Sequence, residues 1–129
     1  MEYQYTKIES YINQYIVKTF MDSIFVEALG NSPTIRVLDF LIEGRGLDYS
    51  LTDIAENSNI GWTTLHRIWD SLLSAGFVIP TREIGRAKLF KLNVQNKSVK
   101  LIIKVHDSLV KETNEKYLNE QSEKAVVRS

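Results

Sequence analysis

The sequence predicts a mainly α-helical protein with one small β-hairpin, an α+β fold. Over most of the chain, apolar residues recur at steps of three and four, the spacing that places them on one face of a helix. Residues 77–92 differ, because two short runs rich in aromatic and branched residues flank a bend that contains glycine. With 129 residues, of which 43% are hydrophobic and 25% charged, the chain has the size and composition of one domain.

The composition argues against several classes of protein. No apolar run approaches the roughly 20 residues of a membrane-spanning helix, and the first ten residues lack the basic start and apolar core of a secretory signal. The chain has no cysteine, which excludes disulfides and thiolate metal sites and fits a cytoplasmic protein. Phosphate-binding loops and nucleophile or metalloprotease motifs do not occur. We therefore expect neither an enzyme nor a cofactor.

Residues 1–30 are expected to form an N-terminal extension, for which two structures stay open. Apolar side chains fall at helical spacing over residues 3–20, and Thr6 with Glu9 matches a capping box. The same stretch is rich in tyrosine, isoleucine, valine and threonine, so it could equally form a β-hairpin. A further helical piece is expected to end near Gly30. The apolar content predicts that the extension packs on the core or on a second subunit.

Two helices have clear start signals. A buried helix is expected to start at Ser32, because serine is a preferred cap and Pro33 suits the first helical position. The glycines in residues 44–46 should end this helix. Ser50 can cap a second, shorter helix, in which Asp53 places a negative charge in the first turn.

The helix predicted over residues 61–75 has two distinct faces, and Gly76 is placed to end it in the left-handed conformation. The residues expected to face the core repeat at three- and four-residue steps: Leu65, Ile68, Trp69, Leu72 and Leu73. The residues left on the outer face cluster toward the N-terminal half: Trp62, Thr63, Thr64, His66, Arg67 and Asp70.

Residues 32–94 resemble a winged helix-turn-helix domain of the broad class that includes the MarR-like and ArsR-like prokaryotic regulators. The resemblance is carried by LTDIA at 51–55, TTLHR at 63–67 and LLSAGFV at 72–78. Together with the segments that flank it, the sequence predicts an organisation in four parts. These are the N-terminal extension 1–30, the winged helix domain 31–95, a C-terminal dimerisation helix 96–120 and a flexible tail 121–129.

The resemblance also implies a DNA-binding surface, with helix 61–75 in the major groove and the bend 82–88, the wing, on phosphate or in the minor groove. Base readout is expected from Thr64, His66 and Arg67, since arginine can bind guanine through two hydrogen bonds. Phosphate contacts are expected from Thr52, Thr63, Arg82, Arg86 and Lys88. Trp62 either stacks on the DNA backbone or covers the turn. The alternative for Arg67 is a solvated charge or an ion pair with Asp70, and for the wing it is a set of solubilising charges.

The charges are unevenly distributed although their sum is zero, with 16 basic and 16 acidic residues. Residues 61–94 carry five basic residues against two acidic ones, whereas residues 31–60 carry two basic against five acidic. A basic half beside an acidic half is the pattern of a one-sided DNA-binding surface. Ordinary scatter of surface charge is the alternative.

Helical periodicity returns from Asn96 onward, and the apolar stripe predicts contact with a partner. The stripe comprises Val99, Ile102, Ile103, His106, Leu109, Val110 and Tyr117. A helix of about 20 residues needs a surface on which to bury such a stripe. Either the N-terminal segment or a second copy of the chain can supply it, and we predict a homodimer. The chain's two histidines, His66 and His106, lie far apart in sequence, so no metal site is expected.

The sequence thus predicts a sequence-specific, double-stranded DNA-binding transcriptional regulator that acts as a homodimer. The alternative is a winged-helix protein–protein interaction module with weak or no DNA binding. The zero net charge and the modest basicity of helix 61–75 favour this alternative.

Overall fold

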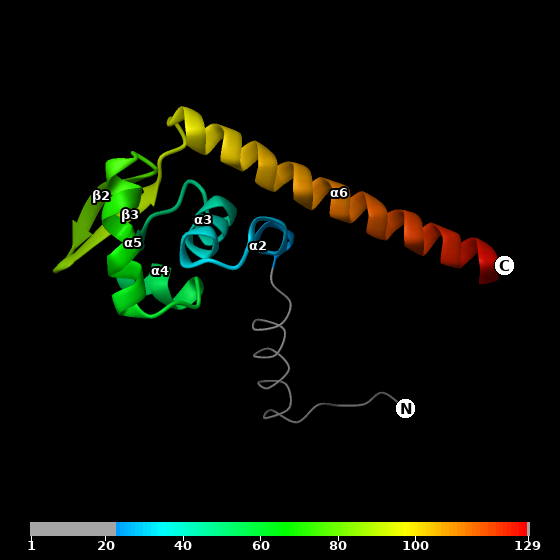
Figure 1. The fold of residues 1–129 in the computed structure, drawn as a ribbon, viewed down its shortest axis with the longest axis horizontal. Coiled ribbons are helices and arrows are strands. Elements are labelled where there is room, and N and C mark those ends of the chain that lie inside the picture. The colour runs from blue at the N-terminus through cyan, green and yellow to red at the C-terminus, as the bar shows by residue number, and fades with distance from the viewer. Residues whose placement is uncertain (1–22, 129) are drawn as a thin grey trace, which may run out of the picture.

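The computed structural model describes residues 23–128, so the choice between helix and hairpin for residues 3–20 lies outside the described residues. The described chain is mainly helical with one small antiparallel sheet, as predicted (Figure 1). Its elements are α2 (Ile24–Leu29), α3 (Pro33–Glu43), β1 (Tyr49–Ser50), α4 (Leu51–Asn57), α5 (Trp62–Ser74), β2 (Val78–Ile84), β3 (Ala87–Leu92) and α6 (Lys97–Arg128). None of the helices in the described range is both long and apolar enough to cross a membrane.

The predicted helix caps are confirmed. The Ser32 hydroxyl accepts a hydrogen bond from a backbone amide in the first turn of α3, with Pro33 at the first helical position. The Ser50 hydroxyl accepts from the backbone amide of Asp53 at 3.2 Å and caps α4. Gly76 follows α5 with φ +74°, the left-handed conformation expected there. Local residue choice therefore fixes where the core helices begin and end.

The sheet contains a strand that the sequence prediction missed. Strand β3 lies in the middle, with β2 on one side and the two-residue β1 on the other. β1 pairs with β3 through Tyr49 opposite Phe90 and Ser50 opposite Leu89. A two-residue strand is too short to show a period-two pattern, which is why only its position beside β3 reveals it.

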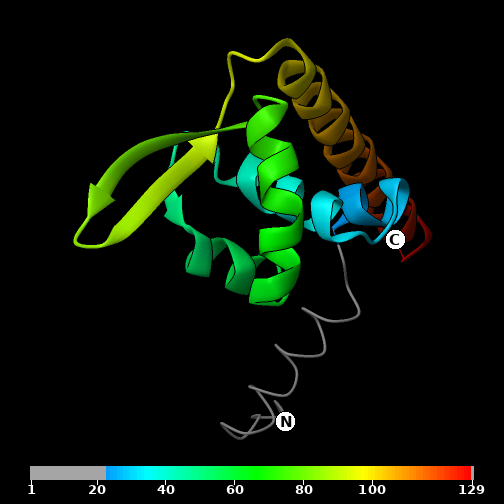
Figure 2. The ribbon, with the colours of Figure 1, turned by 60° about the vertical axis from the view of Figure 1, so that its left-hand side comes forward.

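The predicted seven-residue bend of the wing is wrong. The strands continue through most of residues 82–88, and the turn consists only of Gly85 and Arg86. Gly85 has φ +62°, which suits the first central position of a tight type II′ hairpin turn. The β2–β3 hairpin therefore projects away from the helices (Figure 2).

The core joins the helices to one face of the sheet. Its buried side chains come from α2 to α6 and from β2 and β3, and they include Val37, Leu41, Ile54, Leu65, Trp69, Leu72, Val78, Phe90 and Val99. Trp69 of α5 packs edge-on against Phe90 of β3, with ring centroids 5.1 Å apart. These contacts hold α5 against the sheet and so fix its outer face relative to the hairpin.

Helix α6 packs on the core over its first part and then projects beyond it (Figure 1). Val99 is buried, yet residues 111–124 are all exposed. The helix also continues to Arg128, through most of residues 121–129, where a flexible tail was expected. The stretch NEQSEKA that suggested a polar tail is rich in good helix formers and contains neither glycine nor proline, so it propagates the helix.

Candidate nucleic-acid interface

Helices α4 and α5 are joined by a tight turn over residues 58–61. Asn59 holds φ 55° in this turn, a left-handed conformation that asparagine tolerates better than most residues. Ser58 is buried, and Gly61 stands at the N-cap of α5, where it has no side chain to satisfy the first amides of the helix. These free N–H groups and the positive end of the helix dipole suit an anion such as a phosphate.

The predicted division of α5 into two faces is confirmed by burial. Leu65, Trp69 and Leu72 are buried, and Ile68 and Leu73 are half-buried. On the other side Trp62, Thr63, His66, Arg67 and Asp70 are exposed, while Thr64 is half-buried. Because Thr64 is partly covered, the exposed surface on the N-terminal half of α5 is formed mainly by Trp62, Thr63, His66 and Arg67.

Trp62 and His66 form the flank of α5 that faces the hairpin. Their rings meet edge-on with centroids 4.3 Å apart. Trp62, which is 51% exposed, also borders a shallow depression that the start of α4 and the hairpin complete. The depression is lined by Ser50, Leu51, Thr52, Trp62, Arg86, Ala87, Lys88 and Phe90. The structure thus brings four of the predicted contact residues, Thr52, Trp62, Arg86 and Lys88, around one depression.

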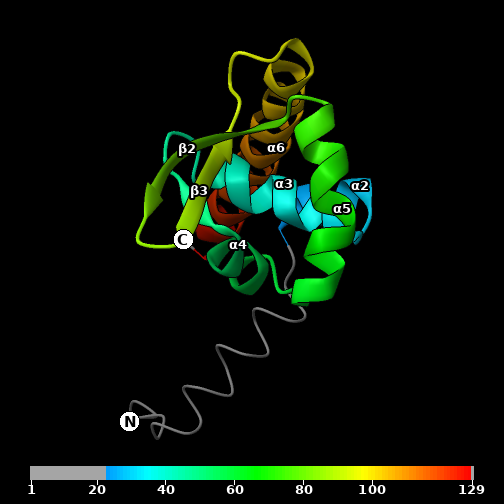
Figure 3. The same cartoon turned by 90° about the vertical axis from the view of Figure 1, so that its left-hand side faces the viewer.

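Arg67 lies on the opposite flank of α5 from Trp62. It borders a second depression with Thr34 at the start of α3 and with Ser71 and Phe77. In the described part of the chain no ion pair joins Arg67 to Asp70, so the alternative of a local pair finds no support. Figure 3 shows α5 and the β2–β3 hairpin at the same end of the molecule, on either side of α4.

Arg82 is held within strand β2 by Asp48 instead of being free in the turn of the hairpin. Its Nε donates to Asp48 Oδ2 at 2.9 Å and its Nη2 donates to Asp48 Oδ1 at 3.2 Å. The Thr81 hydroxyl donates to the same carboxylate at 2.6 Å. The Arg82 hydrogen bonds, followed by that of Thr81, lower the pKa of Asp48 below its usual value. This cluster anchors the irregular register between Pro80 and Glu83.

Asp48 is the residue of this region that the sequence reasoning missed. It precedes β1 and lies 34 positions before Arg82, and nothing in the local pattern links the two. The other cations of the hairpin differ in their surroundings. Lys88 lies directly opposite Glu83 across the two strands. Arg86 occupies the turn and is exposed, so it is the hairpin cation best placed to reach a ligand beyond the protein.

The predicted dimer residues divide into two groups. Val99 and His106 are buried within the chain itself, at 1% and 5% exposure, and Ile102, Ile103 and Leu109 are half-buried against the same core. The expectation that this whole stripe is left for a second copy therefore needs correction, since α2 and α3 cover its first part. Val110 and Tyr117, at 37% and 60% exposure, remain uncovered.

Comparison with known proteins gives matches in structure alone. No protein-family model and no curated protein sequence matches this chain. A point mutant of Staphylococcus aureus MepR bound to an oligodeoxyribonucleotide has a TM-score of 0.55 at 15% identity, covering 97% of this chain and 96% of its own. MepR itself, a transcription regulator of the multidrug efflux pump MepA, has a TM-score of 0.54 at 13% identity, with 96% of each chain covered.

A second regulator shows the same likeness. The zinc-responsive MarR family member ZitR from Lactococcus lactis has a TM-score of 0.52 at 16% identity, covering 90% of this chain and 85% of its own. At such identities the likeness establishes the fold. The order of elements agrees with it, because a helix–turn–helix leads into a β-hairpin and then a long helix. The chain has the winged helix-turn-helix fold, which it shares with these regulators.

Proposed function

We propose that this protein is a transcription regulator that binds a specific double-stranded DNA sequence as a homodimer. The observation that carries this proposal is the meeting of Thr52, Trp62, Arg86 and Lys88, from three different elements, around one exposed depression beside the outer face of α5. Hydroxyl groups and cations of this kind bind phosphates and fix the register of a protein on a duplex. The structural likeness to MepR determined with bound DNA supports the same conclusion.

In this proposal α5 lies in the major groove and the hairpin follows the adjacent backbone. Besides Trp62, the exposed side chains of the N-terminal half of α5 are Thr63, His66 and Arg67, so these three are assigned to base edges and nearby phosphates. Arg86 at the hairpin turn reaches a phosphate or the minor groove. Arg82 takes a different part from the one expected, since its bond to Asp48 makes it a positioning residue for the hairpin.

The second subunit is proposed to cover the distal part of α6. Residues 111–124 are exposed throughout, and Val110, Tyr117 and Leu118 are large apolar side chains among or beside them. A helical extension without tertiary contacts is marginal in water, so a partner surface is needed to hold it. In a two-fold dimer the two copies of α5 would enter the major groove about one helical turn, roughly 34 Å, apart.

An interaction module that does not bind DNA is the second candidate. The observation that favours it is the charge balance of the hairpin, where Arg82 is paired with Asp48 and Lys88 stands opposite Glu83. Two of the three expected cations therefore face acidic side chains, which lowers the positive potential near the hairpin.

Selection of binding sites from random DNA duplexes, followed by a salt titration on the enriched sequences, separates the two candidates. We expect an enriched site with two inverted halves, and an affinity that falls steeply with salt because phosphate contacts release counterions. Arg86→Ala should weaken binding to all sequences alike and flatten the salt dependence by about one unit of slope. Lys100→Ala, which removes an exposed cation of α6 far from this face, is the matched control. An absence of enrichment would favour the interaction module.

A further inference from the structure

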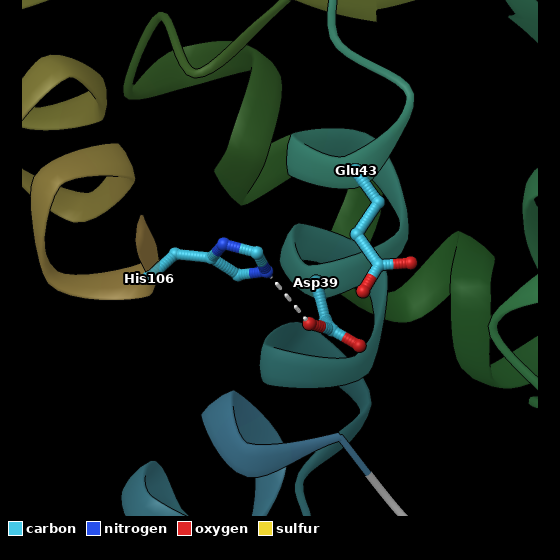
Figure 4. Close-up of side chains that lie close together, drawn as sticks. All are labelled: Asp39, Glu43 and His106. Carbon is cyan, nitrogen blue, oxygen red and sulfur yellow. Dashed lines mark hydrogen bonds and ion pairs between the residues drawn. The ribbon is translucent and has the colours of Figure 1, made fainter. Parts of the chain in front are cut away.

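We propose that Asp39, Glu43 and His106 form a binding site for a divalent transition-metal ion between α3 and α6. The three side chains offer ligand atoms that all lie within 4.8 Å of one another. Asp39 and Glu43 stand one turn apart on the same face of α3, and His106 reaches toward them from α6 (Figure 4). His106 Nε2 lies 3.2 Å from Asp39 Oδ1.

The imidazole of His106 is oriented as a metal ligand needs to be. It is 5% exposed, and the ring of Phe25 packs against it with centroids 5.1 Å apart. Its other nitrogen, Nδ1, lies 3.3 Å from the Asp107 carboxylate. Metal-binding histidines commonly donate their second ring N–H to such a carboxylate, which fixes the tautomer and the direction of the lone pair on Nε2.

Asp107 is itself fixed by a second contact. Arg45 donates to its two oxygens at 3.2 and 3.1 Å, which holds the carboxylate in place beside His106. Arg45 therefore positions Asp107, and Asp107 positions His106 through its Nδ1. Nε2 is then the ring nitrogen that faces the carboxylates of α3.

A simple ion pair between His106 and Asp39 does not account for Glu43. Among the described residues no donor forms a hydrogen bond to the Glu43 carboxylate, although it lies beside both partners of that pair. Asp39 and Glu43 thus place two carboxylates beside one imidazole, and a divalent cation bound between them would balance their negative charge.

The ligand types select the class of metal. One imidazole nitrogen and two carboxylate oxygens suit Zn²⁺, Mn²⁺ or Fe²⁺, whereas Mg²⁺ and Ca²⁺ prefer oxygen ligands throughout. Three protein ligands leave a position for water, and Glu43 is exposed, so an ion can enter from solvent. Spacing along the sequence predicted no metal site, because His106 lies 67 positions from Asp39 and only folding brings them together.

Titration calorimetry of the chelator-treated full chain with Zn²⁺ tests the site. We expect one ion bound per chain, with Mg²⁺ binding far more weakly. Glu43→Gln keeps the side-chain volume and breaks no hydrogen bond, and it should weaken Zn²⁺ binding at least about tenfold. Asp39→Asn should do the same. Glu56→Gln, which neutralises an exposed acid on α4, is the matched control and should leave binding unchanged.

Two further measurements keep the outcome decisive. The chain has only two histidines, so a proton–nitrogen NMR spectrum of the imidazoles should show Zn²⁺ shifting His106 and leaving His66 in place. Zn²⁺ at a hundred times its dissociation constant should lower the unfolding equilibrium constant about a hundredfold. The proposal fails if the wild-type chain binds no Zn²⁺, if both ligand variants bind it unchanged, or if the ion shifts His66 instead.

Discussion

Individual residues of the proposed DNA-binding surface differ in what surrounds them, and this determines what each can do. Arg82, Arg86 and Arg67 have the same side chain, but only Arg82 is held by an acidic partner, Asp48. Arg86 stands at an exposed turn, and Arg67 lies on the flank of α5 away from the hairpin. We therefore expect the three arginines to give three different responses to substitution.

Arg67→Ala should reduce sequence preference. An arginine that binds a base edge through two hydrogen bonds contributes about 1–3 kcal/mol of discrimination against the wrong base. The variant should bind its selected site more weakly by that amount, while binding to unrelated duplexes changes little. Competition binding on the selected and scrambled duplexes measures the difference. Equal losses on both duplexes would assign Arg67 to a phosphate, and no loss would remove it from the interface.

Asp48→Asn should destabilise the fold at neutral pH but not in acid. The pKa of Asp48 is lowered in the folded chain by Arg82 and Thr81, so its contribution to stability is present above the usual aspartate pKa of about 4. That contribution is lost as the pH falls through the lowered folded value. Urea unfolding of the variant and the wild type should therefore differ at pH 7 and converge in acid. A difference that persists at low pH would trace the effect to packing instead.

The helices and strands were predictable from sequence where local chemistry fixes them. Ser32, Ser50 and Gly76 act within one turn of where they stand, so their helix boundaries were right. The length of the hairpin was wrong, because pairing between β2 and β3 carries the strands into a segment whose composition suggests a loop. Strand β1 was missed for the same reason, since its pairing with β3 is its only signal.

The candidate binding sites, like the fold, were predictable from sequence only where local periodicity fixes them. The outer face of α5 follows from helical periodicity, and its exposed residues were identified correctly from sequence except for Thr64, which is half-buried. Contacts between segments distant in sequence were not visible, and both Asp48 with Arg82 and His106 with Asp39 belong to this kind. Pairing of polar side chains depends on the final geometry of the backbone, and single-sequence periodicity carries no information about it.

Leu65→Ala tests whether α5 owes its position to the core. Leu65 is fully buried beneath the outer-face residues Thr63, His66 and Arg67. Removing a buried leucine side chain costs about 2–5 kcal/mol, through lost apolar burial and the remaining cavity. Chemical denaturation should show that loss, and Leu101→Ala, at an exposed leucine of α6, should stay within about 0.5 kcal/mol of the wild type. A small effect at Leu65 would mean that the helix is held by other contacts.

At the scale of the whole molecule, α6 has two functions along its length. Its first part completes the core of its own chain, where Val99 is buried, and its exposed second part extends past every other described element (Figure 1). Because one part of α6 belongs to the core and the other part projects from it, the helix joins the winged helix domain rigidly to whatever holds its far end. In the proposed dimer, that junction sets the distance between the two copies of α5.

Tyr117→Asp tests this arrangement directly. Tyr117 lies two turns beyond Val110 on the same face of α6, and both are exposed in the single chain. If that face is buried between two copies, an unpaired carboxylate there should cost at least about 2 kcal/mol, raising the dimer dissociation constant more than tenfold. Ser108→Asp places the same charge on the opposite, exposed face and should leave the dimer intact. Light scattering over a concentration series measures both variants. A wild-type monomer at tens of micromolar would rule out the dimer, while a dimer insensitive to Tyr117→Asp would move its interface elsewhere.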